Sequence, residues 1–333
     1  MNQTDPSVSS PALRLVLDAL ETEGTHTRRS LAEATRLSDS TVSRAIRLGI
    51  RRGLLIRKEG ADPVSGRPCR HILPAPGLLI PLLSLYPHHG SLRVLNPGLI
   101  PEGSTSVELN PTFTPEENLR LLCRRGLPLL RGMTTRTGLS VTSPILVSDK
   151  ASAPAATLAA CLTDAVGLPP LLMPDRDDCI ARALSAGALP QKRDAASALF
   201  MRVGNGDHAC ILLRTPQGGW TVSSLGHRLT PGLRRTLPAS NCPPELLRRS
   251  VIDLLAELCR FLSPDIILLE DARGILPTEE EWRRLLPEGS PVVILSPGEG
   301  GLTLAERGAA LLGRRALWDR ILEASPPSGV SRE

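Results

Sequence analysis

Residues 38–55 read SDSTVSRAIRLGIRRGLL, and this stretch predicts an amphipathic helix that leads into an apolar strand. At 100° per residue, small and apolar side chains fall on one face of that helix: Val42, Ala45, Ile46, Gly49, Ile50 and Gly53. Polar side chains fall on the opposite face, with Ser43 at its edge: Ser40, Arg44, Arg47 and Arg51. We therefore expect one face to pack on a core and the other to present hydroxyl and guanidinium groups.

Shorter helices are expected before this stretch, and a β-hairpin is expected after it. Thr27 and Ser38 are good N-cap residues for the second and third helices. Residues 54–56 and 70–73 are predicted strands, joined by the turn-rich sequence RKEGADPVSGRP. Three helices followed by a hairpin is the order of a winged helix-turn-helix, in which the third helix enters the major groove of DNA.

The positive charge of the chain is concentrated in this same part. The 333 residues carry a net charge of +5, and residues 1–75 account for +4 of it. A basic unit ahead of a nearly neutral one favours contact with a polyanion. An arginine-rich helix face can also be merely solvated, but the short preceding helix and the basic hairpin favour DNA. Aromatic residues are scarce, which disfavours single-strand binding by base stacking.

The seven cysteines are scattered, with no CxxC pair, so the sequence predicts neither a metal site nor a disulfide framework. Reduced thiols are typical of the cytoplasm. The first residues, MNQTDPSVSS, lack the pattern of a signal peptide. The apolar run PGLLIPLLSLYP is too short to span a bilayer. We expect a cytoplasmic protein with no membrane partner.

After residue 76, short apolar runs alternate with helical patterns, which predicts an α/β fold. The expected strands are 78–85, 92–95, 198–203, 209–214, 265–269 and 291–295. The expected helices are 115–124, 155–166, 179–187, 243–262, 278–286 and 304–323. We predict three parts: a DNA-binding domain at 1–76, a larger domain at 77–325, and a disordered tail at 326–333.

The sequence TRRSLAEATRLSDSTVSRAIRLGIRRGLL (27–55), with SGRP at 65–68, resembles the N-terminal domain of repressors in the ROK family (repressors, open reading frames and kinases). The resemblance implies that Arg67, in the Gly-Arg-Pro of the hairpin, enters the minor groove, where narrow A/T tracts attract arginine. Arg36 stands where the family usually has glycine, and a left-handed backbone there would cost on the order of 1 kcal/mol. The expected DNA-binding residues are Thr27, Ser38, Ser40, Thr41, Ser43, Arg44, Arg47, Arg51 and Arg67.

A weaker resemblance to ROK proteins continues through MPDRDDCIARALSAG (173–187), FMRVGNGDHACILL (200–213) and SSLGHRL (223–229). It implies a two-lobed, actin-like fold of the sugar-kinase type. By this resemblance Asp178 matches the kinase base, and His227 matches the histidine of a Gly-His motif. We take Asp178 and His227 as the remaining positions for an effector.

Several family motifs are replaced in this sequence. ROK kinases hold ATP phosphates with Asp-x-Gly-Gly-Thr, and here the matching positions include Tyr86, His88 and His89. Only His227 and Cys242 remain near the family's zinc ligands, whereas structural zinc needs four ligands. These replacements predict no kinase catalysis, no metal and no cofactor.

The sequence-based hypothesis is a sequence-specific DNA-binding transcriptional regulator, a repressor, that is not an enzyme. The expected partners are double-stranded DNA, a second copy of the chain in a homodimer, and a sugar-like effector. The degenerate ROK-like domain would serve dimerisation and sensing. Two alternatives stay open: a ROK-type sugar kinase with an unusual nucleotide loop, and a DNA-binding protein whose large domain binds only protein partners.

Overall fold

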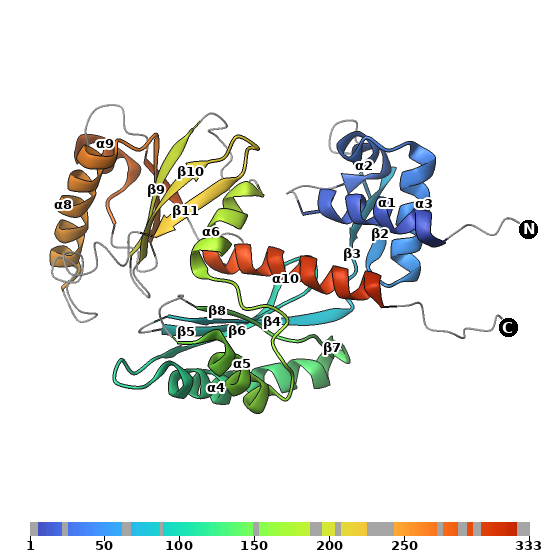
Figure 1. The fold of residues 1–333 in the computed structure, drawn as a ribbon, viewed down its shortest axis with the longest axis horizontal. Coiled ribbons are helices and arrows are strands. Elements are labelled where there is room, and N and C mark those ends of the chain that lie inside the picture. The colour runs from blue at the N-terminus through green and yellow to red at the C-terminus, as the bar shows by residue number, and fades with distance from the viewer. Residues whose placement is uncertain are drawn as a thin grey trace, which may run out of the picture.

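The protein has a mixed α/β fold, as predicted, in a computed structural model (Figure 1). The structure describes residues 6–21, 26–61, 68–86, 89–148, 153–186, 195–203, 208–224, 243–271, 276–285, 292–295 and 301–324. Everything below refers to these residues. No helix among them is long and apolar enough to cross a membrane.

The N-terminal region (residues 6–74) contains three helices and one small antiparallel sheet. The helices are α1 (Pro6–Ala19), α2 (Arg28–Thr35) and α3 (Asp39–Arg51). The sheet has the order β1 (His26–Thr27), β3 (Pro68–Pro74), β2 (Leu55–Ala61). Its core is made of apolar side chains from every helix and from β2 and β3, including Leu13, Leu17, Leu31, Val42, Ile46, Leu55 and Ile72.

Helix α3 has the two faces that its sequence predicts. Its buried residues are Val42, Ala45, Ile46 and Gly49, whereas Ser40, Arg44, Arg47 and Arg51 are exposed. Ile50, expected on the buried face, is 36 % exposed, and Gly53 follows the helix. A Cβ on Gly49 would lie 2.6 Å from Leu55 Cδ1, so the missing side chain lets α3 pack closely on β2.

The larger region contains two five-stranded sheets, each built on an antiparallel meander of three strands. The first sheet begins with three antiparallel strands: β4 (Leu78–Leu85), β5 (His89–Leu95) and β6 (Pro101–Glu108). Two strands then run parallel to β4: β7 (Ser140–Val141) and β8 (Ile145–Ser148). The first sheet is thus an antiparallel meander extended by parallel strands.

The second sheet also begins with a meander, but its two parallel strands lie one beyond the other. Its meander is β9 (Ser197–Val203), β10 (His208–Arg214) and β11 (Trp220–Ser224). Strand β12 (Ile266–Asp271) runs parallel to β9, and β13 (Val292–Leu295) runs parallel to β12. The strand order is β11-β10-β9-β12-β13, so each sheet is extended from the first strand of its own meander.

The helices of the larger region form three layers with the sheets between them (Figure 1). Helices α4 (Pro115–Thr137) and α5 (Ala155–Val166) cover the outer face of the first sheet. Helices α8 (Pro244–Leu262) and α9 (Glu279–Leu285) contribute to the core on the outer face of the second. Helices α6 (Arg176–Ser185) and α10 (Leu304–Glu323) lie between the sheets and share one core with both.

Glycine permits very close packing of α10 at two positions. A Cβ on Gly308 would lie 1.7 Å from the carbonyl oxygen of Cys179 in α6. A Cβ on Gly313 would lie 1.9 Å from Ile145 Cδ1 in β8. Helix α10 therefore lies directly against the α6 backbone and the first sheet, with no room for a side chain at either contact.

Arg36, which stands where ROK repressors usually have glycine, ends α2 in the left-handed conformation, with φ 56° and ψ 26°. We expect Arg36→Gly to raise the free energy of unfolding by about 1 kcal/mol, because glycine has no Cβ to clash at positive φ. Urea denaturation of the full chain measures the change. Gly138, which ends α4 at φ 68° in open space, gives the reverse control: Gly138→Ala should lower stability by about 1 kcal/mol. A loss of stability in Arg36→Gly would contradict this account.

Candidate functional site

The start of α3 presents a group of hydroxyls. Ser38 is the N-cap, and its Oγ accepts a hydrogen bond from the backbone N–H of Thr41 at 3.3 Å. The same Oγ lies 3.0 Å from Ser40 Oγ and 2.9 Å from Thr41 Oγ1. The side chain of Ser38 thus satisfies the helix terminus, and these contacts hold three hydroxyl groups together at the exposed first turn of α3.

Three arginines continue the exposed face along α3: Arg44, Arg47 and Arg51. Arg47 Nε donates to the carbonyl of Ser43 one turn earlier, at 3.3 Å, which directs that side chain along the helix. The next residue after the helix, Arg52, turns inward and donates from Nη1 to the carbonyl of Leu322 in α10, at 3.0 Å. The basic side chains at the end of α3 therefore divide between solvent and the protein.

Thr27 lies at the start of α2 and acts as its N-cap. Its Oγ1 accepts from the backbone N–H of Ser30 at 3.2 Å, and Ser30 Oγ accepts from the Thr27 N–H at 2.8 Å. This reciprocal capping box uses the hydroxyl of Thr27 to fix the entry of α2. Among the other expected site residues, Arg67 and His227 lie outside the described residues, as do His88 and Cys242.

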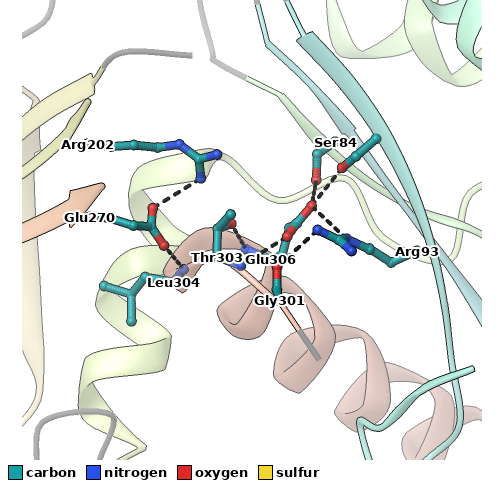
Figure 2. A network of polar contacts seen from close by, with 9 residues as sticks. Ser84, Arg93, Arg202, Glu270, Gly301, Thr303, Leu304 and Glu306 are labelled. Atoms are coloured by element: carbon teal, nitrogen blue, oxygen red, sulfur yellow. Dashed lines mark hydrogen bonds and ion pairs between the residues drawn. The ribbon is translucent and has the colours of Figure 1, made fainter. Parts of the chain in front are cut away.

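A second cluster of polar groups is buried between the two sheets, around the start of α10 (Figure 2). Glu306 is only 2 % exposed. Its carboxylate accepts from Ser91 Oγ at 2.7 Å and from Ser84 Oγ at 3.3 Å, both on the first sheet. It also accepts from the backbone N–H of Thr303 at 3.0 Å, which completes a capping box for α10.

Arg93 of β5 compensates the charge of Glu306. Its Nε lies 3.7 Å from Glu306 Oε1, and its Nη2 donates to the carbonyl of Gly301 at 3.0 Å. One arginine of the first sheet thus binds both the carboxylate inside the first turn of α10 and the backbone just before it.

Glu270, at the end of β12, makes the matching contacts from the second sheet. One carboxylate oxygen accepts from the backbone N–H of Leu304 at 2.7 Å, and the other accepts from Arg202 Nη1 at 3.0 Å. Both side chains are buried. Burial raises the pKa of Glu270 above its ordinary value, and the charge of Arg202 opposes that shift. The first turn of α10 is therefore held by a carboxylate from each side: its own Glu306 and Glu270 of β12.

Tyr86 lies buried beside this cluster. The guanidinium of Arg176 in α6 stacks over its ring at 4.1 Å from the centroid, and that of Arg202 lies at 5.6 Å. Burial raises the pKa of Tyr86 to about 12, so the phenol is neutral at physiological pH. His89 is half-buried, and burial lowers its pKa. At these two positions of the replaced phosphate loop, the structure has a neutral phenol and a histidine in place of a carboxylate and a glycine.

Asp178 stands apart from the buried cluster. It lies in the first turn of α6 and is exposed, although its neighbours Arg176 and Cys179 are buried. The described residues contain no group of three or more His, Cys, Asp or Glu side chains that could hold a metal ion. The sequence correctly predicts that Asp178 lies at a helix start. It does not predict the ion pairs that join β5 to α10 and β9 to β12.

The fold resembles solved structures of ROK proteins, although no protein-family model and no curated protein matches the sequence. One is described as a ROK family transcriptional regulator, a homolog of the E. coli MLC protein; it is 14 % identical, with a TM-score of 0.53, and the match covers 96 % of this chain and all of that one. A glucokinase of the ROK family from Streptomyces griseus, solved with glucose and AMPPNP, is 14 % identical with a TM-score of 0.45, and the match covers 70 % of this chain and 98 % of that one.

A third similar structure is an inorganic polyphosphate/ATP-glucomannokinase from Arthrobacter sp. strain KM, with 13 % identity, a TM-score of 0.45, and coverage of 70 % of this chain and 98 % of that one. The chain shares the actin-like α/β fold of the ROK family regulator. The prediction that the chain is not an enzyme is contradicted here, because sugar kinases are prominent among the structures with this fold.

The buried pair Glu270–Arg202 gives a stability prediction. We expect Glu270→Gln to lower the free energy of unfolding at pH 7 by about 3 kcal/mol, because it leaves the Arg202 charge buried without its carboxylate. Since burial raises the pKa of Glu270, the folded wild type binds a proton at a higher pH than the unfolded chain does, so lowering the pH should increase the stability of the wild type relative to the variant. Chemical denaturation at several pH values measures this.

The control is the exposed pair Arg29–Glu33 on α2. Glu33→Gln should change stability by less than about 0.5 kcal/mol, since exposed ion pairs contribute little. Equal effects of the two substitutions would show that burial of the Glu270–Arg202 pair has no energetic consequence.

Proposed function

We propose that the chain is a sequence-specific transcriptional regulator that binds duplex DNA through α3. The observation that carries the proposal is the exposed face of α3, where capped hydroxyls at the helix start are followed by three arginines one turn apart. Recognition helices place their N-terminal residues against base edges, while basic side chains contact phosphates. The described part of α3 has both features in that order.

The elements around α3 support a winged helix-turn-helix. Helix α2 and α3 are separated by a turn of three residues that contains Arg36, and β2 and β3 form a hairpin directly after α3. We propose that α3 lies in the major groove and that Arg67, between β2 and β3 in sequence, reaches the minor groove. The proposed boundaries are those expected from sequence: a DNA-binding domain at 1–76 and a larger domain at 77–325.

The similarity to a solved transcriptional regulator adds support. That match includes 96 % of this chain, whereas the matches to the two kinases include 70 %. We further propose repression as the outcome, a homodimer that places two copies of α3 on adjacent half-sites, and a sugar-like effector bound by the larger region. Two half-sites one helical turn apart are the usual requirement for a dimer of this kind.

Substitutions on α3 should separate base reading from phosphate binding. Arg44→Ala or Ser43→Ala should relax sequence preference, because these residues lie nearer the start of the helix. Arg51→Ala should weaken binding to all duplexes alike and reduce the salt dependence by about one phosphate contact. In vitro selection followed by titration of selected and random duplexes at two salt concentrations measures both effects.

The matched control is Arg131→Ala, which removes an exposed arginine from α4. It should leave affinity, sequence preference and salt dependence unchanged. If the wild-type protein preferred no selected duplex over random DNA at moderate salt, the proposed function would be wrong.

Sugar phosphorylation is a second candidate function. The observation that favours it is the exposed carboxylate of Asp178 in the first turn of α6, between the two sheets of an actin-like fold. Its position matches the kinase base in the ROK resemblance. A carboxylate that accepts the proton of an attacking sugar hydroxyl contributes general-base catalysis.

If the chain transfers phosphate from ATP to a hexose or amino sugar, Asp178→Asn should lower the rate about 10²–10⁴-fold, the range typical of general-base catalysis. Asp164→Asn on α5 is the control, since Asp164 is also an exposed helical carboxylate. ADP formation with magnesium and a panel of sugars measures the rate. Absence of turnover in the wild type, or turnover that Asp178→Asn leaves unchanged, would reject this candidate.

A further inference from the structure

The last two turns of α10 complete the core of the N-terminal region. Trp318 is 3 % exposed and belongs to the same apolar cluster as Leu13 and Leu17 of α1. Ile321 and Leu322, on the following turn, pack against that cluster. In Figure 1, α10 extends from between the two sheets to the N-terminal region. A helix of the larger region thus supplies an apolar face to the region that carries α3.

Polar contacts reinforce this apolar contact on several sides. Two ion pairs join α1 to α10: Arg14–Asp319 at 2.9 Å and Asp18–Arg315 at 3.7 Å. The hydrogen bond from Arg52 to the carbonyl of Leu322, described above, joins the end of α3 to α10. A third ion pair joins Glu21, just after α1, to Arg182 of α6. We call this set of contacts around Trp318 the dock.

The first turn of α10 is held by the inter-sheet contacts. Glu306 binds Ser84, Ser91 and Arg93 of the first sheet, and Glu270 of the second sheet binds the Leu304 N–H. We call these residues the clamp (Figure 2). A change in the separation or angle of the two sheets must therefore either move the start of α10 or break buried hydrogen bonds and ion pairs of the clamp.

Helix α10 is stiff between the clamp and the dock. It is an uninterrupted helix of 20 residues, so it is about 30 Å long. Gly308 and Gly313 place its backbone directly against α6 and β8, so close packing holds the middle of the helix. Displacement of the first turn is consequently passed along the helix to Trp318 and Asp319.

We propose that α10 is a rigid connector through which the contacts between the two sheets control the position of the N-terminal region, and thereby of α3. Groups that compete for the carboxylates of the clamp would alter the dock without touching any residue of α3. The mechanical coupling depends only on the contacts above, whereas its effect on DNA affinity rests on the proposed function.

Hydrogen exchange of the full chain tests the coupling without DNA. Glu306→Gln, which weakens the clamp, should raise amide exchange about fivefold or more in residues 11–20 of α1, relative to wild type. Glu257→Gln, an exposed carboxylate on α8, is the control and should change nothing. The α4 amides 119–133 report global stability and should keep their wild-type rates.

Exchange that rises only in residues 301–308 and the neighbouring strands would overturn the proposal, because the dock would then be independent of the clamp. If Glu306→Gln also raised exchange in α4, it would have lowered global stability, and the milder Ser91→Ala would replace it. Ser91→Ala removes one hydrogen bond to Glu306, and its exchange in α1 is again compared with its exchange in α4. An unchanged α1 in Ser91→Ala, with faster exchange at the first turn of α10, again contradicts the coupling.

A double-mutant cycle on a selected duplex tests the consequence for DNA. Ser91→Ala in the clamp and Asp319→Asn in the dock lie far apart in the fold, so independent effects on Kd should multiply. We expect each to weaken binding about fivefold and the pair to weaken it little further, since both release the same connector. Multiplicative effects would contradict transmission through α10. A wild type that selects no duplex would refute the proposed function instead, and the exchange experiment would still decide the coupling.

Discussion

The larger region depends on the interactions of one buried carboxylate, that of Glu306. Burying an ionised carboxylate is costly unless it is hydrogen-bonded and paired. Here two serine hydroxyls, a backbone N–H and an arginine supply these partners, and they come from the first sheet and from the start of α10. Because the partners belong to different elements, satisfying one charge also fixes where α10 begins relative to the first sheet.

The same logic explains why two similar sheets form one unit. Both sheets are buried on both faces, and α6 and α10 fill the space between them, which gives β4 and β12 their continuous apolar sequences. Gly308 removes the side chain where α10 crosses α6, so the two helices fit between the sheets. The polar clamp then lies at one end of this layer, where its contacts help to fix the position of α10 relative to the two sheets.

Local sequence patterns predicted much of this fold. The ranges 78–85, 155–166 and 304–323 agree with β4, α5 and α10, and the two faces of α3 follow its 3.6-residue period. The sequence does not predict strand β6, because PEGSTSVE has the polar and small residues of an edge strand. The sequence predicts that helix α4 ends at 124, whereas it continues to Thr137, because Gly126 and Pro128 resemble a helix break that tertiary packing overrides.

The candidate sites differ in the same way: local sequence predicts one of them and misses the other. The face of α3 is a property of one segment, so its pattern is visible in the sequence. The clamp joins residues up to 222 positions apart, and no local period brings Ser84 next to Glu306. One signal was available: the Thr303-x-x-Glu306 spacing of a capping box marks the start of α10, although it does not reveal the second role of the carboxylate. The prediction that the replaced motifs exclude an enzyme is contradicted, although the resemblance already implied a fold of the sugar-kinase type, because replaced motifs alone do not determine what such a fold does.

The burial of Trp318 against α1 has a consequence for how the protein is made. A ribosome synthesises α1, α2 and α3 before α10, and the helix that closes their core follows about 250 residues after α3, which takes some tens of seconds at ordinary rates of elongation. During that interval the apolar side of the nascent region around Leu13 and Leu17 lacks its cover. The growing chain is thus accessible to chaperones and proteases around α1 until α10 has been translated, and the docking of α10 joins the two described helices that are most distant in sequence.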